Sequence, residues 1–318
     1  MSTNLLNQAS VRGEFARQLE LAANVGLASR LALEVNSDVE TDVYALVSRV
    51  PKARKWLGAR QMKTITAVRQ SIRNEPWESS AQIPLPDFQR DQTMQLAGKL
   101  GELATELMTN RWRLITDLIK NNTALAYDGL ALFHASHVFG NSGTQTNLLT
   151  ATECPKLNVA TAADPTPEEL VEAIMQAIGY MQGYLDDEAE PFMQDSREWL
   201  LLYPQDLQGT FRIALGANNL AGGEVNPVKA SIDGLSITGR MEKRLYSAAS
   251  GNTVFYIVST DGGRNKPFVL QNENGPNVNA LGPGSEWALL NNTIALLGDW
   301  RGGAGVGEPL RIAKCTLS

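Results

Sequence analysis

The sequence predicts an α+β fold built around one long helix, and three observations predict it. Apolar residues recur every three or four positions from Gln92 to Ile119, which is the spacing of one face of an amphipathic helix. A second helix is predicted after Thr166, because this cap residue is followed by Pro167 and Glu169 at their preferred first-turn positions. Short β-type runs separated by Gly- and Asn-rich loops fill much of the C-terminal half.

Length and composition are those of a globular chain. The 318 residues favour two domains with an ample core, and 43% apolar and 19% charged residues are ordinary values. No apolar run approaches the roughly 18 residues that a membrane span needs. Met1 to Asn4 start no basic region followed by an apolar one, so we expect no secretory signal and a chain made and used in a cytoplasm.

Four elements are predicted ahead of the long helix. Residues 11–32 have helical apolar spacing without a clear surface to bury it, which fits an N-terminal arm that docks on a neighbour. A capped short helix is expected at 38–47. Strands are expected at 63–68 and 77–88, and the prolines of the second confine it to a sheet edge. Together the two strands predict a long hairpin that projects ahead of the helix.

Beyond the long helix, the Thr166 helix carries one apolar face that includes Leu170 and Ile174. Glu198–Tyr203 reads as a buried strand, and a short helix is expected from Asp206 toward Leu215. Further strands are predicted at 231–238, 253–259, 268–271, 286–297 and 310–317.

Metal and cofactor chemistry find little support. Cys154 and Cys315 are far apart in sequence, so we expect two reduced cysteines and no disulfide framework. His134 and His137 are the only histidines and have no further ligand at metal spacing, whereas a closed zinc site needs four. We therefore expect no metal and no cofactor, and interpret both histidines as partners of backbone groups. Asp128-Gly129 predicts a turn, and Leu130, Leu132 and Phe133 are expected to anchor the strand that follows it in the core.

The sequence also contains no complete catalytic motif. Ser136 lies beside His137, with Asp128 nearby, but no Gly-x-Ser-x-Gly elbow surrounds the serine. The glycine-rich run Gly302–Gly307 lacks the lysine of a phosphate-binding loop and leaves too little chain for a βαβ unit. A tightly packed or flexible β-region is the better interpretation of that run.

Charge is segregated along the chain, although the net charge is only −6. Between Pro51 and Asn74 there are seven basic residues and no acidic one, and between Leu157 and Ser196 there are nine acidic residues and no basic one. Either run could be a solvated face. Complementary patches on one chain also suit head-to-tail association between copies. The residues assigned to such contacts are Lys52, Arg54, Lys55, Arg60, Lys63, Arg69, Arg73, Trp77, Asp186, Asp187 and Glu188.

Three blocks of the sequence resemble one family. The segment Tyr127–His137 follows the long helix with the pattern Tyr-Asp-Gly-x-x-Leu-Phe-x-x-x-His, which members of the Mu-like phage major head subunit family carry at the same place. Upstream, residues 37–60 are similar to the family's segment entering its extended loop. Downstream, Gly298–Gly307 is similar to the family's glycine-rich final strand region.

The resemblance implies a Hong Kong 97-type phage capsid fold. It divides the chain into an N-terminal arm at 1–50, an extended loop at 51–90, a peripheral domain with the spine helix at 91–160, an axial domain at 161–284, and strands returning to the peripheral domain at 285–318. The long helix at 92–119 is the spine helix of that plan. In such folds the extended loop overlaps the adjacent subunit.

The resemblance also implies a function, which is to build the icosahedral shell that encloses the double-stranded DNA of a tailed phage or prophage. Its partners are then other copies, in pentamers and hexamers, together with scaffold, portal and decoration proteins, and no membrane. The shell is assembled in the host cytoplasm and becomes the virion capsid. No enzyme activity is expected.

Two alternatives from other classes remain open at this stage. One is a hydrolase-like enzyme that uses Asp128, Ser136 and His137, although no recognisable constellation supports it. The other is a nucleic-acid-binding protein that uses the basic stretch from Lys52 to Arg73, although it must explain an acidic whole.

Overall fold

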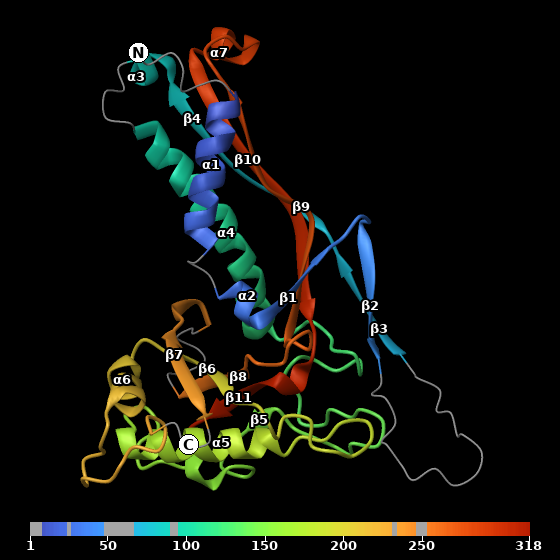
Figure 1. The fold of residues 1–318 in the computed structure, drawn as a ribbon, viewed down its shortest axis with the longest axis vertical. Helices are drawn as coiled ribbons and strands as arrows, with labels where there is room; N and C mark the ends of the chain where they lie inside the picture. The colour runs from blue at the N-terminus through green and yellow to red at the C-terminus, as the bar shows by residue number, and fades with distance from the viewer. Residues whose placement is uncertain (1–7, 24–26, 48–66, 90–94, 231–233, 246–252) are drawn as a thin grey trace, which may run out of the picture. The chain divides into compact units, whose positions relative to one another are not determined.

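The computed structural model describes residues 8–23, 27–47, 67–89, 95–230, 234–245 and 253–318. The chain forms two compact units, each assembled from separate stretches of sequence. Unit 1 comprises residues 1–42, 71–115 and 269–305, and unit 2 comprises residues 43–70, 116–268 and 306–318. Figure 1 shows the fold, coloured along the chain from blue at the N-terminus to red at the C-terminus.

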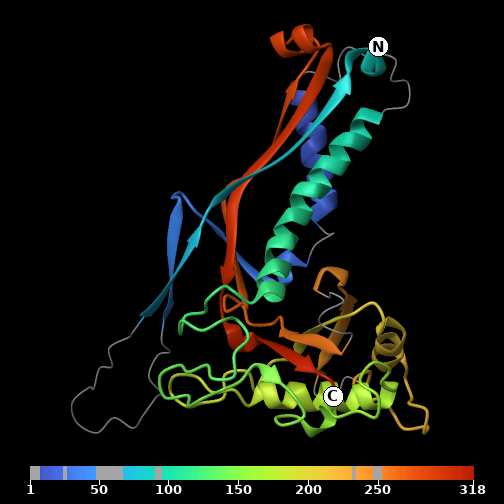
Figure 2. The same cartoon turned by 180° about the vertical axis from the view of Figure 1, so that it is seen from behind.

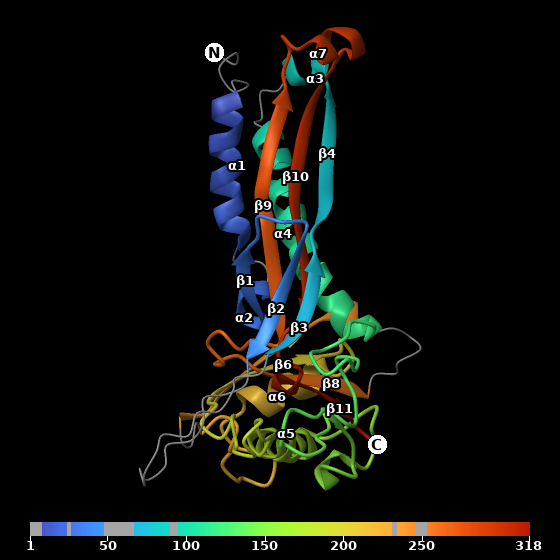
Figure 3. The same ribbon diagram turned by 90° about the vertical axis from the view of Figure 1, so that its right-hand side faces the viewer.

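The long helix and a four-stranded sheet make the core of unit 1. Helix α4 (Gln95–Asn121) is one continuous helix, which confirms the predicted spine element. The sheet order is β1-β9-β10-β4, with strands β1 (Ala32–Asn36), β9 (Phe268–Leu281), β10 (Thr293–Val306) and β4 (Glu75–Pro84). Figure 3 shows β9, β10 and β4 side by side with α4 behind them. The buried core residues are Phe15, Leu100, Leu103, Ala104, Leu107, Val278, Ala280, Ile294, Leu296 and Trp300.

Helix α1 (Gln8–Ala23) packs on the core of unit 1, and it is followed by the short helix α2 (Ala28–Leu31). Phe15 is buried in the core of unit 1, and Leu19 packs against that core. The expectation that this helix has no clear surface to bury its apolar side chains was wrong, because the core shared by α4 and the sheet receives Phe15. The helical pattern expected as far as residue 32 also ends early, since 32–36 forms β1.

The predicted short helix at 38–47 is wrong. Residues 41–47 form strand β2 (Thr41–Val47), which pairs with β3 (Ala67–Arg73) in a two-stranded sheet. β-Branched and aromatic residues dominate this stretch and fit a pleated ribbon better than a helix. Asp38, the predicted cap, lies instead in a turn, in which the Oγ of Ser37 contacts the Val39 backbone.

The predicted hairpin between the two strands ahead of the long helix is also wrong. Strand β3 pairs with β2, while β4 pairs antiparallel with β10, from Glu75 opposite Gly302 to Pro84 opposite Thr293. The placement of β4 at a sheet edge is confirmed. Helix α3 (Leu85–Gln89) follows β4 directly. Sequence proximity suggested the wrong partner, because β10 comes from about 200 residues further along the chain.

The stretch expected as one strand at 286–297 is divided. Helix α7 (Glu286–Asn291) occupies its first half, and Ser285 caps this helix by accepting a hydrogen bond from the Ala288 amide at 3.2 Å. Asn292 then takes the left-handed conformation with φ 50° before β10 begins. The local cap and turn therefore override the apolar run that favoured a strand.

Unit 2 is a mixed sheet covered by helices. The sheet order is β5-β11-β8-β6-β7, with β5 (Leu148–Leu149), β11 (Ile312–Thr316), β8 (Val254–Ser259), β6 (Glu198–Tyr203) and β7 (Ser236–Met241). Figure 2 shows helix α5 (Pro167–Gln182, yellow-green) below these strands, and α6 (Gln208–Gly216) follows β6 in sequence. The β6 boundaries and the Thr166–Glu169 capping box were both predicted and are confirmed.

Short 3-10 helices complete unit 2 at η1 (Pro155–Leu157), η3 (Lys243–Leu245) and η4 (Pro309–Arg311). Its core combines the apolar face of α5 with the buried side chains of β6 and β8, including Ile174, Trp199 and Phe255. Among the helices that the structure describes, none combines the length and the apolar character required to cross a membrane.

Candidate functional site

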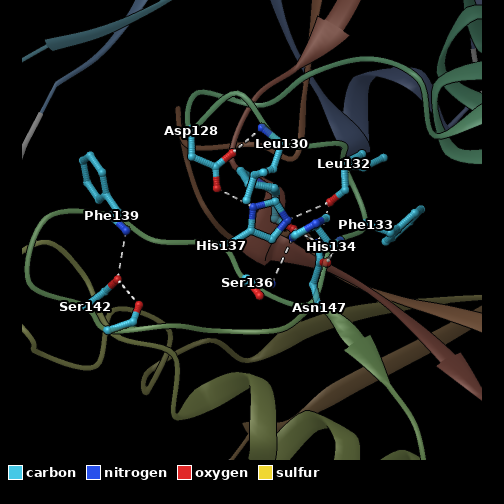
Figure 4. Close-up of polar contacts among 12 residues, drawn as sticks. Asp128, Leu130, Leu132, Phe133, His134, Ser136, His137, Phe139, Ser142 and Asn147 are labelled. Carbon is cyan, nitrogen blue, oxygen red and sulfur yellow. Dashed lines mark hydrogen bonds and ion pairs between the residues drawn. The ribbon is translucent and has the colours of Figure 1, made fainter.

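The segment that carries the family-like motif follows α4 and belongs to unit 2. Three hydrogen bonds close its turn. The Ala126 amide donates to the Leu130 carbonyl at 2.7 Å, the Gly129 amide donates to the Ala126 carbonyl at 3.0 Å, and the Leu130 amide donates to Asp128 Oδ1 at 3.1 Å. Gly129 has φ +75°, a conformation that strongly favours glycine. The predicted Asp-Gly turn is therefore confirmed, and Figure 4 shows Asp128 directed from it toward His137.

His137 lies at the centre of this segment and is fully buried. Its Nδ1 is 2.6 Å from Asp128 Oδ2, and its Nε2 is 3.2 Å from the Leu132 carbonyl oxygen (Figure 4). Burial alone would raise the pKa of Asp128, but the hydrogen bond and charge of His137, with the Leu130 amide, lower that pKa overall. The pair thus fixes the turn to the chain that follows it.

Two asparagines supply the backbone hydrogen bonds that a regular strand would otherwise make. The Asn122 side chain bonds both to the Phe133 amide, at 2.7 Å, and to the Phe133 carbonyl, at 3.1 Å. Buried Asn147 accepts from the His134 amide and donates to the Leu132 and Pro309 carbonyls. Sequence reasoning missed both residues, although an asparagine in a Gly/Asn/Ser-rich loop is a usable signal for such contacts.

The strand expected after the Asp-Gly turn does not form. The stretch is a loop closed by single bridges, Leu125 to Ala131 and His137 to Gln145, because side chains rather than a ladder satisfy its backbone. Its apolar anchors are nevertheless placed as expected, with Leu132 and Phe133 buried. The Phe133 ring lies 5.4 Å from the ring of Tyr256 on β8.

The geometry gives no support to a nucleophilic triad. Exposed Ser136 donates its backbone amide to His134 Nδ1 at 3.1 Å, while the His137 ring nitrogens face Asp128 and Leu132. The interpretation of both histidines as partners of backbone groups is confirmed. Ser136, the serine of the hydrolase alternative, thus contacts His134 through its backbone amide and not His137 through its hydroxyl.

Neither the cysteines nor the other potential metal ligands form a disulfide or a metal site among the described residues. Cys154 and Cys315 are free and buried, as expected. Burial raises the pKa of Cys154 to about 11, and it also raises the pKa of Cys315 well above its usual value. Within the described ranges no group of three or more His, Cys, Asp or Glu side chains could hold a metal ion.

The predicted basic contact residues are placed only in part. Lys52, Arg54, Lys55, Arg60 and Lys63 lie outside the described residues, as does the side chain of Arg69 in β3. Arg73 is exposed and forms an ion pair of 2.9 Å with exposed Glu40 of unit 1. Trp77 stacks on Trp300 with ring centroids 6.3 Å apart, and its Nε1 donates to the Gly302 carbonyl.

The predicted acidic contact residues lie in a tight turn of unit 2. Asp186 and Asp187 are only 6% and 4% exposed, and Asp186 Oδ1 accepts from the amides of Glu188 and Glu190. Glu188 is half-buried, while Glu190 and Asp195 are exposed. The exposed negative charge of this stretch therefore comes from neighbours of the two aspartates.

Comparison with known proteins gives a consistent result. Residues 6–161 match the family model for the Mu-like prophage major head subunit gpT. A 110-residue segment is 27% identical to the major capsid protein of Escherichia phage Mu, covering 34% of this chain and 36% of that protein. The matched segment therefore spans about a third of the length of that curated relative.

Solved capsid structures share the fold of the whole chain. The procapsid of bacteriophage JBD30 matches 98% of this chain and 75% of its own, with a TM-score of 0.53 and 16% identity. The capsid of cyanophage P-SCSP1u matches 91% of this chain and 86% of its own, with a TM-score of 0.56 and 14% identity. A virus-like particle from Pyrococcus furiosus matches 95% of this chain and 98% of its own, with a TM-score of 0.54 and 9% identity. The fold class predicted from the sequence is confirmed as an α+β capsid fold.

Proposed function

We propose that this chain, which belongs to the Mu-like major head subunit family, is a major capsid protein that self-assembles into the icosahedral head of a tailed phage or prophage. The observation that carries the proposal is the family match over residues 6–161, because this stretch contains both α4 and the Tyr127–His137 turn. The shared capsid fold across nearly the whole chain supports the same conclusion. The role of the protein is structural and not enzymatic.

The five sequence segments would then serve five parts of a shell subunit. We assign residues 1–50 to the N-terminal arm, 51–90 to the extended loop, 91–160 to the peripheral domain with its spine helix, 161–284 to the axial domain, and 285–318 to the returning strands. Long, narrow elements such as α4 and the 14-residue strands β9 and β10 suit a wall built from overlapping subunits.

Contacts between copies are assigned to the segregated charges. The basic stretch from Lys52 to Arg73, with Trp77, would meet the acidic stretch around Glu188 on a neighbouring subunit. Because Asp186 and Asp187 are buried in their own turn, the exposed Glu190 and Asp195 would present the acidic charge. Each exposed pair would contribute only about 0.2 to 1 kcal/mol, but a shell repeats the contact many times.

The remaining partners follow from the same proposal. Other copies would form pentamers and hexamers, with scaffold, portal and decoration proteins joining in the host cytoplasm, and the product would be the virion capsid. DNA would be enclosed and not specifically bound. A net charge of −6 is compatible with this role, because strong counterion-release binding to the shell wall would immobilise the genome.

The size of the particles that the protein forms separates a shell protein from the enzyme and nucleic-acid-binding alternatives. The purified full-length chain is examined by analytical ultracentrifugation and negative-stain microscopy, alone and with its phage co-factors. Rings or closed particles are expected. A compact monomer that persists at high concentration under both conditions would contradict the proposal.

A further inference from the structure

Strand β4 forms one edge of the four-stranded sheet of unit 1, beside β10 (Figure 3). Among the described residues, no strand pairs with its outer edge. Its side chains alternate between half-buried and exposed from residue 77 to residue 84. The backbone N–H and C=O groups of a strand alternate between its two edges with the same period, so every second residue of β4 presents these groups to the outer edge.

The ladder between β4 and β10 determines which residues these are. The register is continuous over the ten residues of β4, and the Leu85 amide continues it by donating to the Asn292 carbonyl at 2.9 Å. A Cβ on Gly298 would lie 3.0 Å from the Ser79 carbonyl oxygen, which places that carbonyl on the β10 side as well. Odd-numbered residues of β4 therefore bond to β10, and even-numbered residues present their backbone groups outward.

Two prolines bound this outer edge. Pro76 and Pro84 are both even-numbered, so each occupies a position at which a missing N–H removes no bond to β10. The outward N–H donors between them belong to Glu78, Ser80 and Gln82, whose side chains are exposed. The edge is thus a short window with three donors, closed at both ends by a residue that cannot donate.

The sequence of this window reads nearly the same in both directions about Ser80. Residues at equal distances before and after Ser80 match in character: small Ser79 and Ala81, polar Glu78 and Gln82, apolar Trp77 and Ile83, and the prolines Pro76 and Pro84. An isologous contact needs this kind of self-complementarity, because the same surface patch is used by both copies. The window therefore fits a second copy of itself.

We propose that β4 is an interface strand, on which β4 of a second copy pairs antiparallel about a two-fold axis between the two Ser80 residues. In this register the Ser80 residues exchange both backbone hydrogen bonds, and Glu78 of each copy lies opposite Gln82 of the other. Each copy donates three hydrogen bonds, so every outward N–H of the window has a partner. The two four-stranded sheets then continue as one.

Side chains support this register over its neighbours. A two-fold axis perpendicular to the sheet keeps corresponding faces on the same side, so Trp77 of one copy lies beside Ile83 of the other. Both side chains pack against the core of unit 1 and are only partly buried there. The contact therefore extends that core with an aromatic and a β-branched residue, a combination that stabilises sheets. An axis at Glu78 would instead place two carboxylates directly opposite each other.

This pairing rests on the proposed function in one respect, because it names one contact of the self-association proposed above. A pair of short strand edges is small beside the roughly 800 Å² per partner that a stable complex buries. The pairing should therefore be weak between dilute subunits. It should be strong in particles, where other contacts hold the copies close together.

Disulfide trapping in the full-length protein tests the register. Residues that exchange backbone hydrogen bonds have Cα atoms about 5.5 Å apart, within the range that a disulfide spans. On oxidation, Ser80→Cys should crosslink into dimers about tenfold faster than Glu78→Cys or Gln82→Cys, whose own counterparts lie about 13 Å away. A mixture of Glu78→Cys and Gln82→Cys should crosslink as fast as Ser80→Cys. The native cysteines are buried and do not compete.

The oxidation is carried out on particles and on concentrated unassembled subunit, so the test does not depend on shell formation. Crosslinking no faster at Ser80 than at Glu78 in both preparations would overturn the pairing, even if shells form. Fast crosslinking at Ser80 in a protein that forms no rings or particles would support the pairing and contradict the proposed function.

A proline variant gives a second measurement that needs no cysteine. The Ser80 N–H faces outward, so Ser80→Pro should leave the unfolding midpoint of the subunit nearly unchanged and slow particle formation severalfold. Ser79→Pro is the matched control, because it removes a bond to β10 and should lower the midpoint. Particle formation at the wild-type rate by Ser80→Pro would count against the pairing.

Discussion

At the scale of single residues, three tight turns of unit 2 share one backbone geometry. They are closed by the bridges Leu125 to Ala131, Leu185 to Pro191 and Asn219 to Val225. In each turn the fifth residue has positive φ, and these residues are Gly129 (75°), Ala189 (58°) and Gly223 (81°). Ala189 is the exception in residue type, since an L side chain is strained in the left-handed region.

Replacing Ala189 by glycine should therefore stabilise the protein. Relief of the left-handed strain exceeds the extra entropy that glycine loses on folding, so we expect a gain of about 0.5 to 1 kcal/mol, measured as the midpoint of thermal unfolding. Gly223→Ala is the matched control, because no atom would contact its new Cβ and only φ opposes it. The control should lower the midpoint. Equal effects of both changes would contradict the strain argument.

Replacing Phe133 tests whether this side chain anchors the segment after α4 in the core. The side chain is 4% exposed and packs on Tyr256, so Phe133→Ala should cost about 3 to 5 kcal/mol in the free energy of unfolding. Chemical denaturation of the unassembled subunit measures this loss. Val138→Ala, at a side chain that is 44% exposed, should cost far less. Similar losses for the two variants would show that Phe133 carries no special packing role.

At the scale of elements, the glycine-rich end of β10 is explained by close packing of backbones. A Cβ on Gly302 would lie 2.2 Å from the Gln271 carbonyl oxygen and 2.3 Å from the Trp300 ring, and one on Gly303 would lie 2.3 Å from the Arg73 carbonyl oxygen. Such distances are far below a van der Waals contact, and a backbone carbonyl cannot rotate away as a flexible side chain can. The interpretation of this run as a tightly packed β-region is confirmed.

Gly302→Ala should strongly destabilise unit 1. The forced separation of β10 from β9 should cost about 1 to 3 kcal/mol or more, visible as a lower unfolding midpoint and a changed tryptophan fluorescence. Gly275→Ala in β9 is the control, because its new Cβ would meet no atom within 4 Å. That change should be neutral or slightly stabilising. A tolerated Gly302→Ala would contradict the close approach described above.

At the scale of the whole molecule, the charge segregation should act on assembly and not on folding. Reversal of Arg69 and Arg73 to Glu should slow or block particle formation and leave the subunit's unfolding midpoint nearly unchanged, because exposed pairs are individually weak. Light scattering follows assembly, and 1 M salt should weaken it as well, since screening then extends only about 3 Å.

A control variant shows whether the loss of assembly comes from these positions or from any change in the net charge of the protein. Lys99→Glu in α4 changes the charge by as much as either single arginine reversal, and it breaks an exposed 2.7 Å pair with Glu102. It should leave assembly largely intact, whereas Arg69→Glu or Arg73→Glu alone should already slow it. Reversal of Glu190 and Asp195 to Lys should partly rescue the Arg69 and Arg73 variant. Assembly indifferent to the basic reversal and to salt would show that both charged runs are solvated faces.

The sequence by itself determined the elements whose signals are local. The period of apolar residues in α4, the Thr166–Glu169 capping box of α5 and the uniformly apolar run of β6 each depend on neighbours in sequence, and each is present as predicted. The Asp128–Gly129 turn belongs to the same class. The three family-like blocks added the fold class, which periodicity alone does not specify.

Tertiary structure decided the pairings and the polar cluster. Strand β4 pairs with β10 and not with its sequence neighbour β3, because register depends on which distant strand completes a buried face. His137 was recognised from the sequence as a structural residue, but its pairing with Asp128 was not predicted. Asn147 was not predicted either, and its side chain joins the Leu132 carbonyl to the Pro309 carbonyl, 162 residues further along the chain. Such contacts join residues far apart in sequence, and only the folded chain determines which of these residues meet.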